Sequence, residues 1–336
     1  MKVNIKILKY ACISALILLT TAKAQVTQQA QTGFRFLLNP VSAEVIARGG
    51  TGLTSTYNSN AVFWNPAMLG FVQTDYDVNL NRTNGIADIN YNAAAASIKL
   101  GEVGTLALSA MAMDYGTLHA TVRADNDNGY LDMGTFSPGA SAFGIAFSQK
   151  MNDRFSYGIQ IKLAHQNLGE AYTMRTGDSL NLYKVAYKKN VIAGDVGAFY
   201  DFNYNGIRFG AVMQNISPQV KYEVEGFQLP FAISFGLSFE PLDFLMQKNP
   251  EHNFVLSVES YHPKDFGSKV KVGGEYSFSN LFFVRGGYMS NYDGRSFTAG
   301  AGIRQEISGI NFRVDYAYQP YEIFGGVHFI TLGIAY

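Results

Sequence analysis

Five histidines are the residues of this chain best suited to acid–base or metal chemistry, and they are widely scattered. They are His119, His165, His252, His262 and His328. None of them forms a closely spaced metal-binding motif, and no Gly-x-Ser-x-Gly nucleophile elbow is present. We therefore expect no metal site, no cofactor and no catalytic residue, and we interpret the chain as a protein that is not an enzyme.

Charged side chains recur instead at alternate positions of apolar segments. Around Val270, one face carries Val270, Val272 and Tyr276, while the other carries Lys271 and Glu275. A period of two residues is that of a strand with one apolar and one polar face. The pattern predicts eight charges facing the lumen of a barrel: Lys162, Asp195, Glu259, Lys271, Glu275, Arg285, Arg313 and Asp315. They form either a packed structural network or the lining of a selective pore.

Fourteen segments show this alternation. They cover 76–83, 89–100, 103–114, 140–151, 154–167, 191–203, 206–215, 230–240, 252–261, 268–278, 281–291, 296–307, 310–319 and 327–336. Their lengths suit the ~9–11 residues that a tilted strand needs to cross a bilayer. An even number of strands is usual in bacterial single-chain barrels. The sequence therefore predicts an all-β fold, a transmembrane antiparallel β-barrel of fourteen strands over residues 76–336.

Short and long connections alternate between these segments. Tight turns are expected at 101–102, 152–153, 205–206, 279–280 and 308–309, and long loops at 115–139, 168–190 and 216–229. The link 241–251 is longer than the other turns and could hold a short helix. Short turns are periplasmic in such barrels, so we expect both termini on the periplasmic side.

The first residues predict export. Three lysines (Lys2, Lys6 and Lys9) precede a short apolar run at 11–20, and Ala22-Lys23-Ala24 favours cleavage before Gln25. This is the layout of a signal peptide, here residues 1–24. Cleavage removes the only cysteine, Cys12, and four lysines, leaving 22 basic against 26 acidic residues. A chain that is not basic is not expected to bind nucleic acid.

The alternative to a membrane barrel is a soluble β-sandwich or a lipocalin-like barrel, whose apolar faces point inward. Aromatic residues make up 14% of the chain and gather on the apolar faces, as in the aromatic girdles of membrane barrels. The last segment carries Ile330, Leu332, Ile334 and Tyr336 on one face. A terminal aromatic residue resembles the signal read by the outer-membrane assembly machinery, and Tyr336 is the expected signal. These features favour the outer membrane, with its lipid as a partner.

Residues 33–75 do not show the alternation of simple strands. Ser42 is expected to cap a short helix over Ala43–Arg48, which Gly49 and Gly50 end. The motif Asn65-Pro66-Ala67 follows, and its plain interpretation is structural, because Asn and Pro fix turn geometry. Direct contact with a ligand is the other interpretation of the motif.

The stretch FRFLLNPVSAEVIARGGTGLTSTYNSNAVFWNPAMLGF resembles the start of the PorV/PorQ family, within the FadL-like group of outer-membrane barrels. The stretch DMGTFSPGASAFGIAFSQKMNDRFSYGIQIKLAHQNLG is similar to the middle of that family. The resemblance implies that residues 25–75 form a hatch inside the lumen. It also implies a role in the type IX secretion system of Bacteroidetes-like bacteria, with the translocon and the C-terminal domains of secreted cargo as partners.

Two functions therefore remain. As a secretion component, the protein would bind partners through its long loops, which carry Asp125, Asn126, Asp127, Tyr130, Tyr172 and Tyr183. As a FadL-like channel, it would pass hydrophobic small molecules and release them sideways through the wall. The glycine pairs 273–274, 286–287 and 325–326 could kink a strand for such an opening, or could serve curvature.

Overall fold

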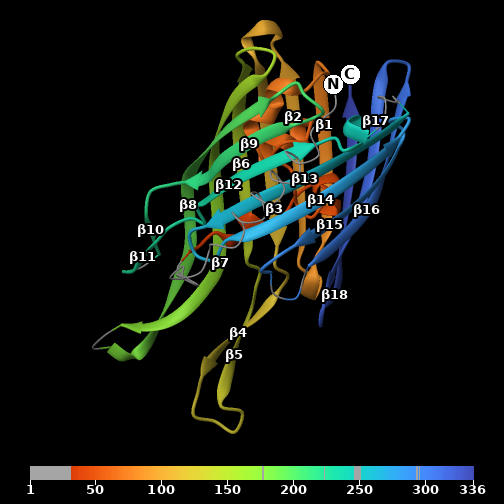
Figure 1. Ribbon diagram of the computed structural model, residues 1–336. Helices are drawn as coiled ribbons and strands as arrows, with labels where there is room; N and C mark the ends of the chain where they lie inside the picture. Colours follow the sequence, from red (N-terminus) through yellow and green to blue (C-terminus); the bar gives the residue numbers. More distant parts are fainter. Residues whose placement is uncertain (1–31, 176–177, 223, 246–250, 293, 295) are drawn as a thin grey trace.

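The computed structural model describes residues 32–175, 178–222, 224–245, 251–292, 294 and 296–336 of the 336-residue chain. The expected signal peptide, with Cys12 and the cleavage site, lies outside these residues. Fourteen strands form a closed antiparallel barrel (Figure 1), which confirms the fold class predicted from the alternation. The ring closes between the first and last strands, where Tyr76 and Tyr336 exchange two backbone hydrogen bonds of 2.9 Å.

The wall strands are β1 (Tyr76–Asn84), β2 (Asn90–Lys99), β3 (Thr105–Asp114), β6 (Gly139–Lys150), β7 (Phe155–Arg175), β8 (Asp178–Asp201), β9 (Arg208–Ile216), β12 (Ala232–Phe239), β13 (His252–Pro263), β14 (Lys269–Phe278), β15 (Phe282–Met289), β16 (Phe297–Ile307), β17 (Ile310–Tyr321) and β18 (Gly325–Ala335). Short 3₁₀ turns η4 (Ile86–Asp88) and η5 (Gly101–Val103) join the first three strands, and helix α3 (Leu242–Leu245) occupies part of the link 241–251. Among the described residues, no helix is long and apolar enough to cross a membrane.

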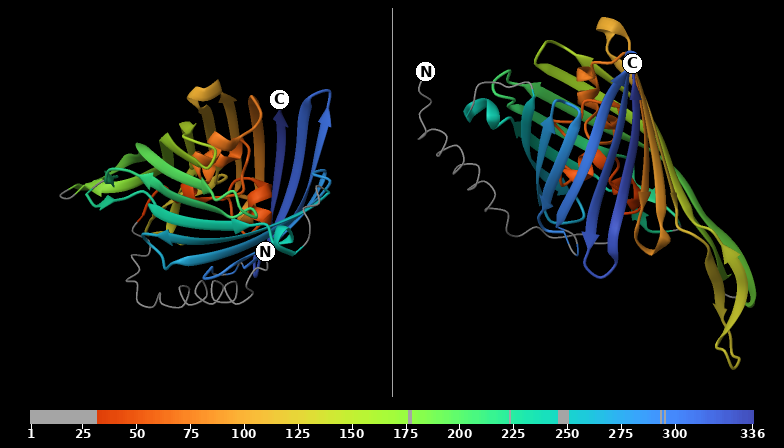
Figure 2. Two further views of the ribbon diagram at one scale, coloured as in Figure 1. Left: turned by 45° about the horizontal axis from the view of Figure 1, so that its top comes forward. Right: turned by 90° about the vertical axis from the view of Figure 1, so that its right-hand side faces the viewer.

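Three segments expected as loops contain strands instead. The segment 115–139 folds into the hairpin β4 (Leu118–Arg123) and β5 (Tyr130–Phe136), and 216–229 into the small hairpin β10 (Val220–Lys221) and β11 (Gly226–Phe227). β7 and β8 run through most of 168–190 and project with β4–β5 far beyond the barrel (Figure 2). The prediction of loops was wrong. β4 and β5 are exposed on both faces, so they lack the apolar face on which period-two recognition depends, and β10 and β11 have only two residues each.

The barrel carries its apolar side chains outside and its polar ones inside. On β17, Phe312, Val314 and Tyr316 are 39%, 52% and 43% exposed, whereas Arg313 and Asp315 between them are 9% and 2% exposed. A soluble barrel would show the reverse arrangement. The outward belt therefore faces lipid, and closure of the ring satisfies the backbone polar groups within it.

The segment from Thr32 to β1 lies inside the barrel as a hatch (Figure 2). It is built from η1 (Arg35–Leu38), α2 (Ala43–Ala47), η2 (Ser59–Phe63) and η3 (Pro66–Phe71). Ser42 precedes α2, but its φ is 77° and its side chain makes no capping hydrogen bond, so the expected capping role is wrong. Thr32 donates to Asp265, which follows the end of β13. The N-terminus that we expected on the periplasmic side lies outside the described residues, so its placement stays a prediction.

Two wall glycines let the hatch backbone lie directly on the strands. A Cβ at Gly273 of β14 would overlap the Arg48 carbonyl, and one at Gly287 of β15 would overlap the backbone of Gly49. Their neighbour Gly286 has no such contact, because its nearest atom is 3.9 Å from an added Cβ. Close approach of two backbones, rather than a kinked strand, is what Gly273 and Gly287 provide.

Candidate functional site

The Asn-Pro-Ala motif lies at the junction of the hatch and the wall. The Asn65 side chain accepts a hydrogen bond from the Ala67 N–H (3.1 Å) and donates to the Leu53 and Ala198 carbonyls (3.0 and 3.1 Å). Pro66 opens η3, where a missing N–H costs nothing. The Asn65 side chain thus joins the turn at Ala67 and the segment at Leu53, both in the hatch, to β8 at Ala198.

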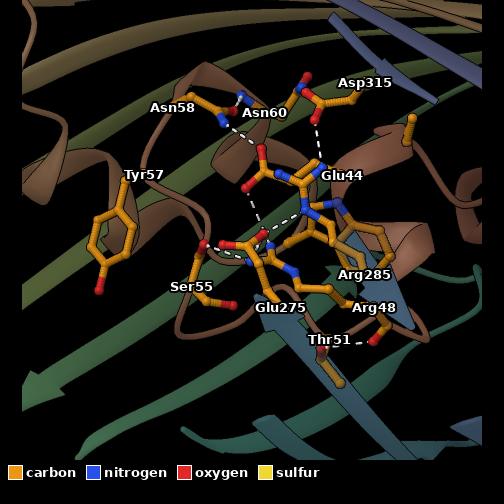
Figure 3. A network of polar contacts seen from close by, with 12 residues as sticks. Glu44, Arg48, Thr51, Ser55, Tyr57, Asn58, Asn60, Glu275, Arg285 and Asp315 are labelled. Carbon is orange, nitrogen blue, oxygen red and sulfur yellow. Dashed lines mark hydrogen bonds and ion pairs between the residues drawn. The ribbon is translucent and has the colours of Figure 1, made fainter. Parts of the chain in front are cut away.

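A buried ion network ties α2 to the wall (Figure 3). Arg48 is 1% exposed and pairs with Glu44 one turn earlier (3.4 Å) and with Glu275 of β14 (3.2 Å). Glu275 also pairs with Arg285 of β15 (2.5 Å), which in turn pairs with Asp315 of β17 (2.6 Å). Each charge is therefore compensated at low exposure, as buried ions require.

Two more pairs extend the network. Arg313 contacts Asp77 of β1 at 2.5 Å, and Arg304 of β16 contacts Glu44 at 3.4 Å. Sequence reasoning missed Glu44, Arg48, Asp77 and Arg304. Asp77 alternates with outward Val78, so the period-two signal was present there, but the hatch residues follow no strand pattern that would have revealed them.

The network keeps the Glu44 carboxyl ionised. Burial alone would raise the pKa of Glu44 above its ordinary value of 4.5, but the charges of Arg304, Arg48, Arg285 and Arg313 outweigh that effect. The result is a pKa of about 2. Asn58 also donates to this carboxylate at 2.9 Å, so the hatch adds a neutral partner to the arginines.

The other four predicted charges lie apart from this network. Lys162 contacts Asp195 (2.8 Å) and donates to the Asn215 side chain (2.6 Å), while the Asn215 N–H donates to Asp195 (2.7 Å). On β13 and β14, Glu259 and Lys271 are register partners that both contact the hatch. Glu259 accepts the Leu53 N–H (2.6 Å) and Lys271 donates to the Gly50 carbonyl (3.3 Å).

These four charges line a cavity of about 360 Å³ between hatch and wall. Its other walls include Val41, Phe63 and Trp64 of the hatch and Met111, Met113, Met289, Tyr261, Phe266 and Tyr292 of the barrel side. The eight predicted residues therefore divide into two groups. Glu275, Arg285, Arg313 and Asp315 belong to the packed network, and Lys162, Asp195, Glu259 and Lys271 border a space of ligand size.

The wall is interrupted beside this cavity. β8 pairs with β9 only from Asp201 to Gly194, and near the end of this pairing β9 has a bulge in which Gln214 and Asn215 (φ 59°) stand opposite Asp195. Towards the long-loop end, no described strand pairs with this edge of β8. The outward side chain next to the break, Ile192, is 62% exposed, which places the break within the apolar belt.

An aromatic cluster closes the break from inside. Tyr222 and Phe227 of the β10–β11 hairpin stack at 5.4 Å, Phe227 stacks on Phe34 at 6.3 Å, and Tyr187 of β8 lies 6.3 Å from Tyr222. Phe34 is 1% exposed and adopts a left-handed φ of 54°. We call Phe34, Tyr187, Tyr222 and Phe227 the side closure. It joins the start of the hatch, the small hairpin and the wall.

The remaining predicted features are placed as follows. Tyr336 is 66% exposed, and its assembly role stays a prediction. Tyr130, on the projecting β5, is 50% exposed. Within the part of the chain that the structure describes, no group of three or more His, Cys, Asp or Glu side chains could hold a metal ion.

No protein-family model and no curated protein sequence matches this chain. Solved structures do match it. The toluene transporter TodX of Pseudomonas putida aligns with 92% of this chain and 98% of its own, at 12% identity and a TM-score of 0.55. The toluene transporter TbuX of Ralstonia pickettii aligns with 91% and 98%, at 14% identity and a TM-score of 0.54. At such identities the likeness is one of fold, and with the outward apolar belt it makes this chain an outer-membrane β-barrel.

Proposed function

We propose that the protein is an outer-membrane channel for hydrophobic small molecules, of the FadL-like kind, with a lateral route through its wall. The observation that carries the proposal is the break between β8 and β9, which lies in the apolar belt beside the lumenal cavity. Arg35 and Tyr115 border both that cavity and the adjoining hollow that Phe34, Tyr222 and Phe227 of the side closure line, so the side closure lies on the path from the cavity to the break. The descriptions of TodX and TbuX as toluene transporters support this function over a role in secretion.

The hatch adds a second argument. Its fully buried residues, among them Leu53, Asn65, Met68 and Leu69, fill the lumen between the cavity and the periplasmic turns. A straight path to the periplasm would require the hatch to move against its ion network. A sideways path requires movement of the small hairpin and Phe34, which are held by stacking and by single hydrogen bonds such as Gly33 N–H to the Gln228 carbonyl (3.2 Å) and Tyr222 to Gln166 (3.3 Å), outside the ion network.

Locking the side closure tests the proposal. Tyr187→Cys together with Tyr222→Cys places two thiols in a chain whose only natural cysteine is Cys12, in the expected signal peptide. Cells of a heterologous Gram-negative host would be given N-phenyl-1-naphthylamine, whose fluorescence rises when it reaches lipid. We expect dye entry to depend on the protein, to fall on oxidation and to recover on reduction. The two single-cysteine variants are matched controls that should not respond. Dye entry equal to that of cells without the protein would refute the channel.

Protein secretion is the second candidate, and the projecting hairpins favour it. β4–β5 and the outer parts of β7 and β8 present exposed side chains such as Tyr130 and Leu131, both half exposed, far from the wall (Figure 2). Surfaces of this kind on a rigid scaffold are suited to binding another protein. Pull-down from solubilised outer membranes, with and without residues 118–136, tests this role. Recovery of neither translocon components nor cargo with the full chain would exclude it.

A further inference from the structure

The segment between β9 and β12 leaves the wall and returns to it at neighbouring points. Gln214 and Ala232 are the last register partners of the two strands. The small hairpin, which carries Tyr222 and Phe227 of the side closure, lies between them in the sequence. A movement that takes these rings off the hatch is therefore hinged at the two ends of the segment, just beyond the last register pair.

Asn215 joins the two ends of this segment. It is 2% exposed, and its side-chain amide donates to the Pro230 carbonyl at 3.0 Å. Its backbone is left-handed (φ 59°), a conformation that asparagine adopts more readily than most other residues. Asn215 therefore turns the chain out of β9 and also ties it to the start of β12.

Two charged side chains of the wall fix Asn215 from the cavity side. Lys162 of β7 donates to the Asn215 side-chain oxygen at 2.6 Å, and the Asn215 backbone N–H donates to Asp195 of β8 at 2.7 Å. Lys162 and Asp195 also pair with each other at 2.8 Å, and both border the cavity. The side-chain oxygen, the side-chain nitrogen and the backbone N–H of one buried residue are thus all engaged. We call Lys162, Asp195, Asn215 and Pro230 the stem clasp.

We infer that Asn215 is the positioning residue of the side exit, and that the stem clasp holds the small hairpin closed on the hatch. This inference rests on the proposed channel and names the group that controls its opening. A buried carbonyl or ammonium group that loses its hydrogen-bond partner is costly, so the clasp stabilises the closed arrangement relative to one in which the segment has turned at its ends. Because Lys162 and Asp195 line the cavity, the clasp lies between a ligand there and the hinge of the hairpin.

Asn215→Asp is the sharpest perturbation of the clasp. Aspartate has nearly the shape of asparagine and can still accept from Lys162, but it cannot donate to the Pro230 carbonyl and places two acceptors face to face. Loss of this bond should make release of the hairpin about fivefold or more frequent. Asn215→Gly removes the whole amide but accepts a left-handed backbone without strain, so it should act in the same direction. It keeps the test available if the added charge of aspartate prevents folding, which gel migration without heating reports.

A buried alanine reports release of the hairpin without any transport. Ala193 of β8 is 1% exposed and lies in an apolar cluster with Val220 and Leu229, both from the segment between β9 and β12. The chain's only natural cysteine, Cys12, lies in the expected signal peptide, so a maleimide would label an Ala193→Cys protein at residue 193. Labelling should proceed when the hairpin leaves this cluster.

We expect both Asn215 variants to speed this labelling about fivefold or more. Asn280→Asp is the matched control, because Asn280 is also left-handed (φ 53°) but is exposed in the turn between β14 and β15. It should label at the rate of the Ala193→Cys parent.

Dye entry tests the same step in cells. Asn215→Asp should speed entry about fivefold or more, and the oxidised Tyr187–Tyr222 lock should abolish that gain, because both act on the same hairpin. A leak elsewhere in a damaged barrel would not respond to the lock.

Two results would overturn the inference. One is labelling of Ala193→Cys that neither Asn215 variant speeds, and the other is faster dye entry that the oxidised lock leaves in place. In either case wild-type dye entry that responds to the lock would leave the channel standing. Labelling that depends on Asn215, in a protein whose wild type passes no dye, would refute the channel but not the clasp.

Discussion

Replacing Arg48 with methionine is the sharpest test of how the hatch is held. Methionine keeps an unbranched apolar stem like that of arginine but removes the guanidinium and its charge from the centre of the network. The change breaks the pairs with Glu44 and Glu275 and the hydrogen bond to the Ser55 carbonyl (3.3 Å). It leaves the barrel strands themselves untouched. We therefore expect the hatch to loosen while the wall persists.

The structure sets the size of this effect. Removing one partner of a buried ion pair costs about 3–5 kcal/mol, because the other charge is left without compensation. In this network both acids keep a second cation, since Glu44 retains Arg304 and Glu275 retains Arg285. We therefore expect the lower end of the range, about 3 kcal/mol, which is roughly a 100-fold change in the equilibrium for hatch release.

Two signals separate the hatch from the wall during urea unfolding of the purified protein. Trp64 belongs to the hatch, so its fluorescence follows hatch release, while migration on a gel without heating follows the barrel. The Arg48→Met protein should lose the Trp64 signal at lower urea than wild type, with the barrel transition little changed. Arg304→Met is the matched control. Its side chain is 35% exposed and makes one long ion pair, so its loss should cost less than about 1 kcal/mol.

An Arg48→Met protein whose Trp64 transition moves no further than that of Arg304→Met would refute the reasoning. Such a result would mean that apolar packing and backbone contacts, rather than the ion network, hold the hatch in the lumen.

Three further predictions concern the hatch, its charge and the side closure. Gly287→Ala should force the hatch off the wall and lower its stability by about 1–3 kcal/mol in the same urea assay, because the new Cβ overlaps the Gly49 backbone. The stabilisation that ionised Glu44 gives, at most about 3 kcal/mol, should be fully present above pH 4.5 and lost as the pH falls toward 2. The stabilisation is lost on acidification because folding lowers the pKa of Glu44. The pH dependence of the Trp64 transition in urea would measure this effect. Tyr222→Ala should speed dye entry by up to about tenfold, since an aromatic pair contributes about 0.5–1.5 kcal/mol.

Each of these predictions has an outcome that would contradict it. Gly286→Ala adds the same methyl group one residue away without a close contact, so equal destabilisation by both variants would contradict the account of Gly287. A Glu44→Gln protein should lose the part of the acid dependence that Glu44 supplies, and an unchanged pH profile would contradict its assignment. Unchanged or slower dye entry in Tyr222→Ala would contradict the role of the side closure.

The wall strands could be predicted because the signal for each strand lies within its own residues. A strand between lipid and lumen must alternate apolar and polar side chains, and segments such as 310–319 show that alternation. Arg313 and Asp315 then fall on the polar side, alternating with outward Phe312, Val314 and Tyr316. The number of strands, fourteen, followed from turn signals that also lie in short stretches of sequence.

The hatch contacts and the outer strands were not predictable in this way. Glu44 and Arg48 meet wall residues more than 200 positions away, and nothing in a Gly-rich segment specifies those partners. The outer parts of β7 and β8 are held by pairing with each other, so their sequence need not alternate. The break beside β8 likewise lies next to the bulge of β9, where the Asn215 N–H donates to Asp195 of another strand.

The length of β8 has a consequence at the cell surface. The strand has 24 residues, whereas a bilayer crossing needs about 9–11. Roughly a dozen residues therefore stand outside the lipid, and at about 3.3 Å each they reach some 40 Å beyond it. An antibody or a bacteriophage approaching the cell would meet the projecting hairpins β4–β5 and β7–β8 before the wall (Figure 2). A peptide epitope carried by the β4–β5 hairpin would be displayed far from the wall and the hatch, at the kind of site where proteins tolerate insertions.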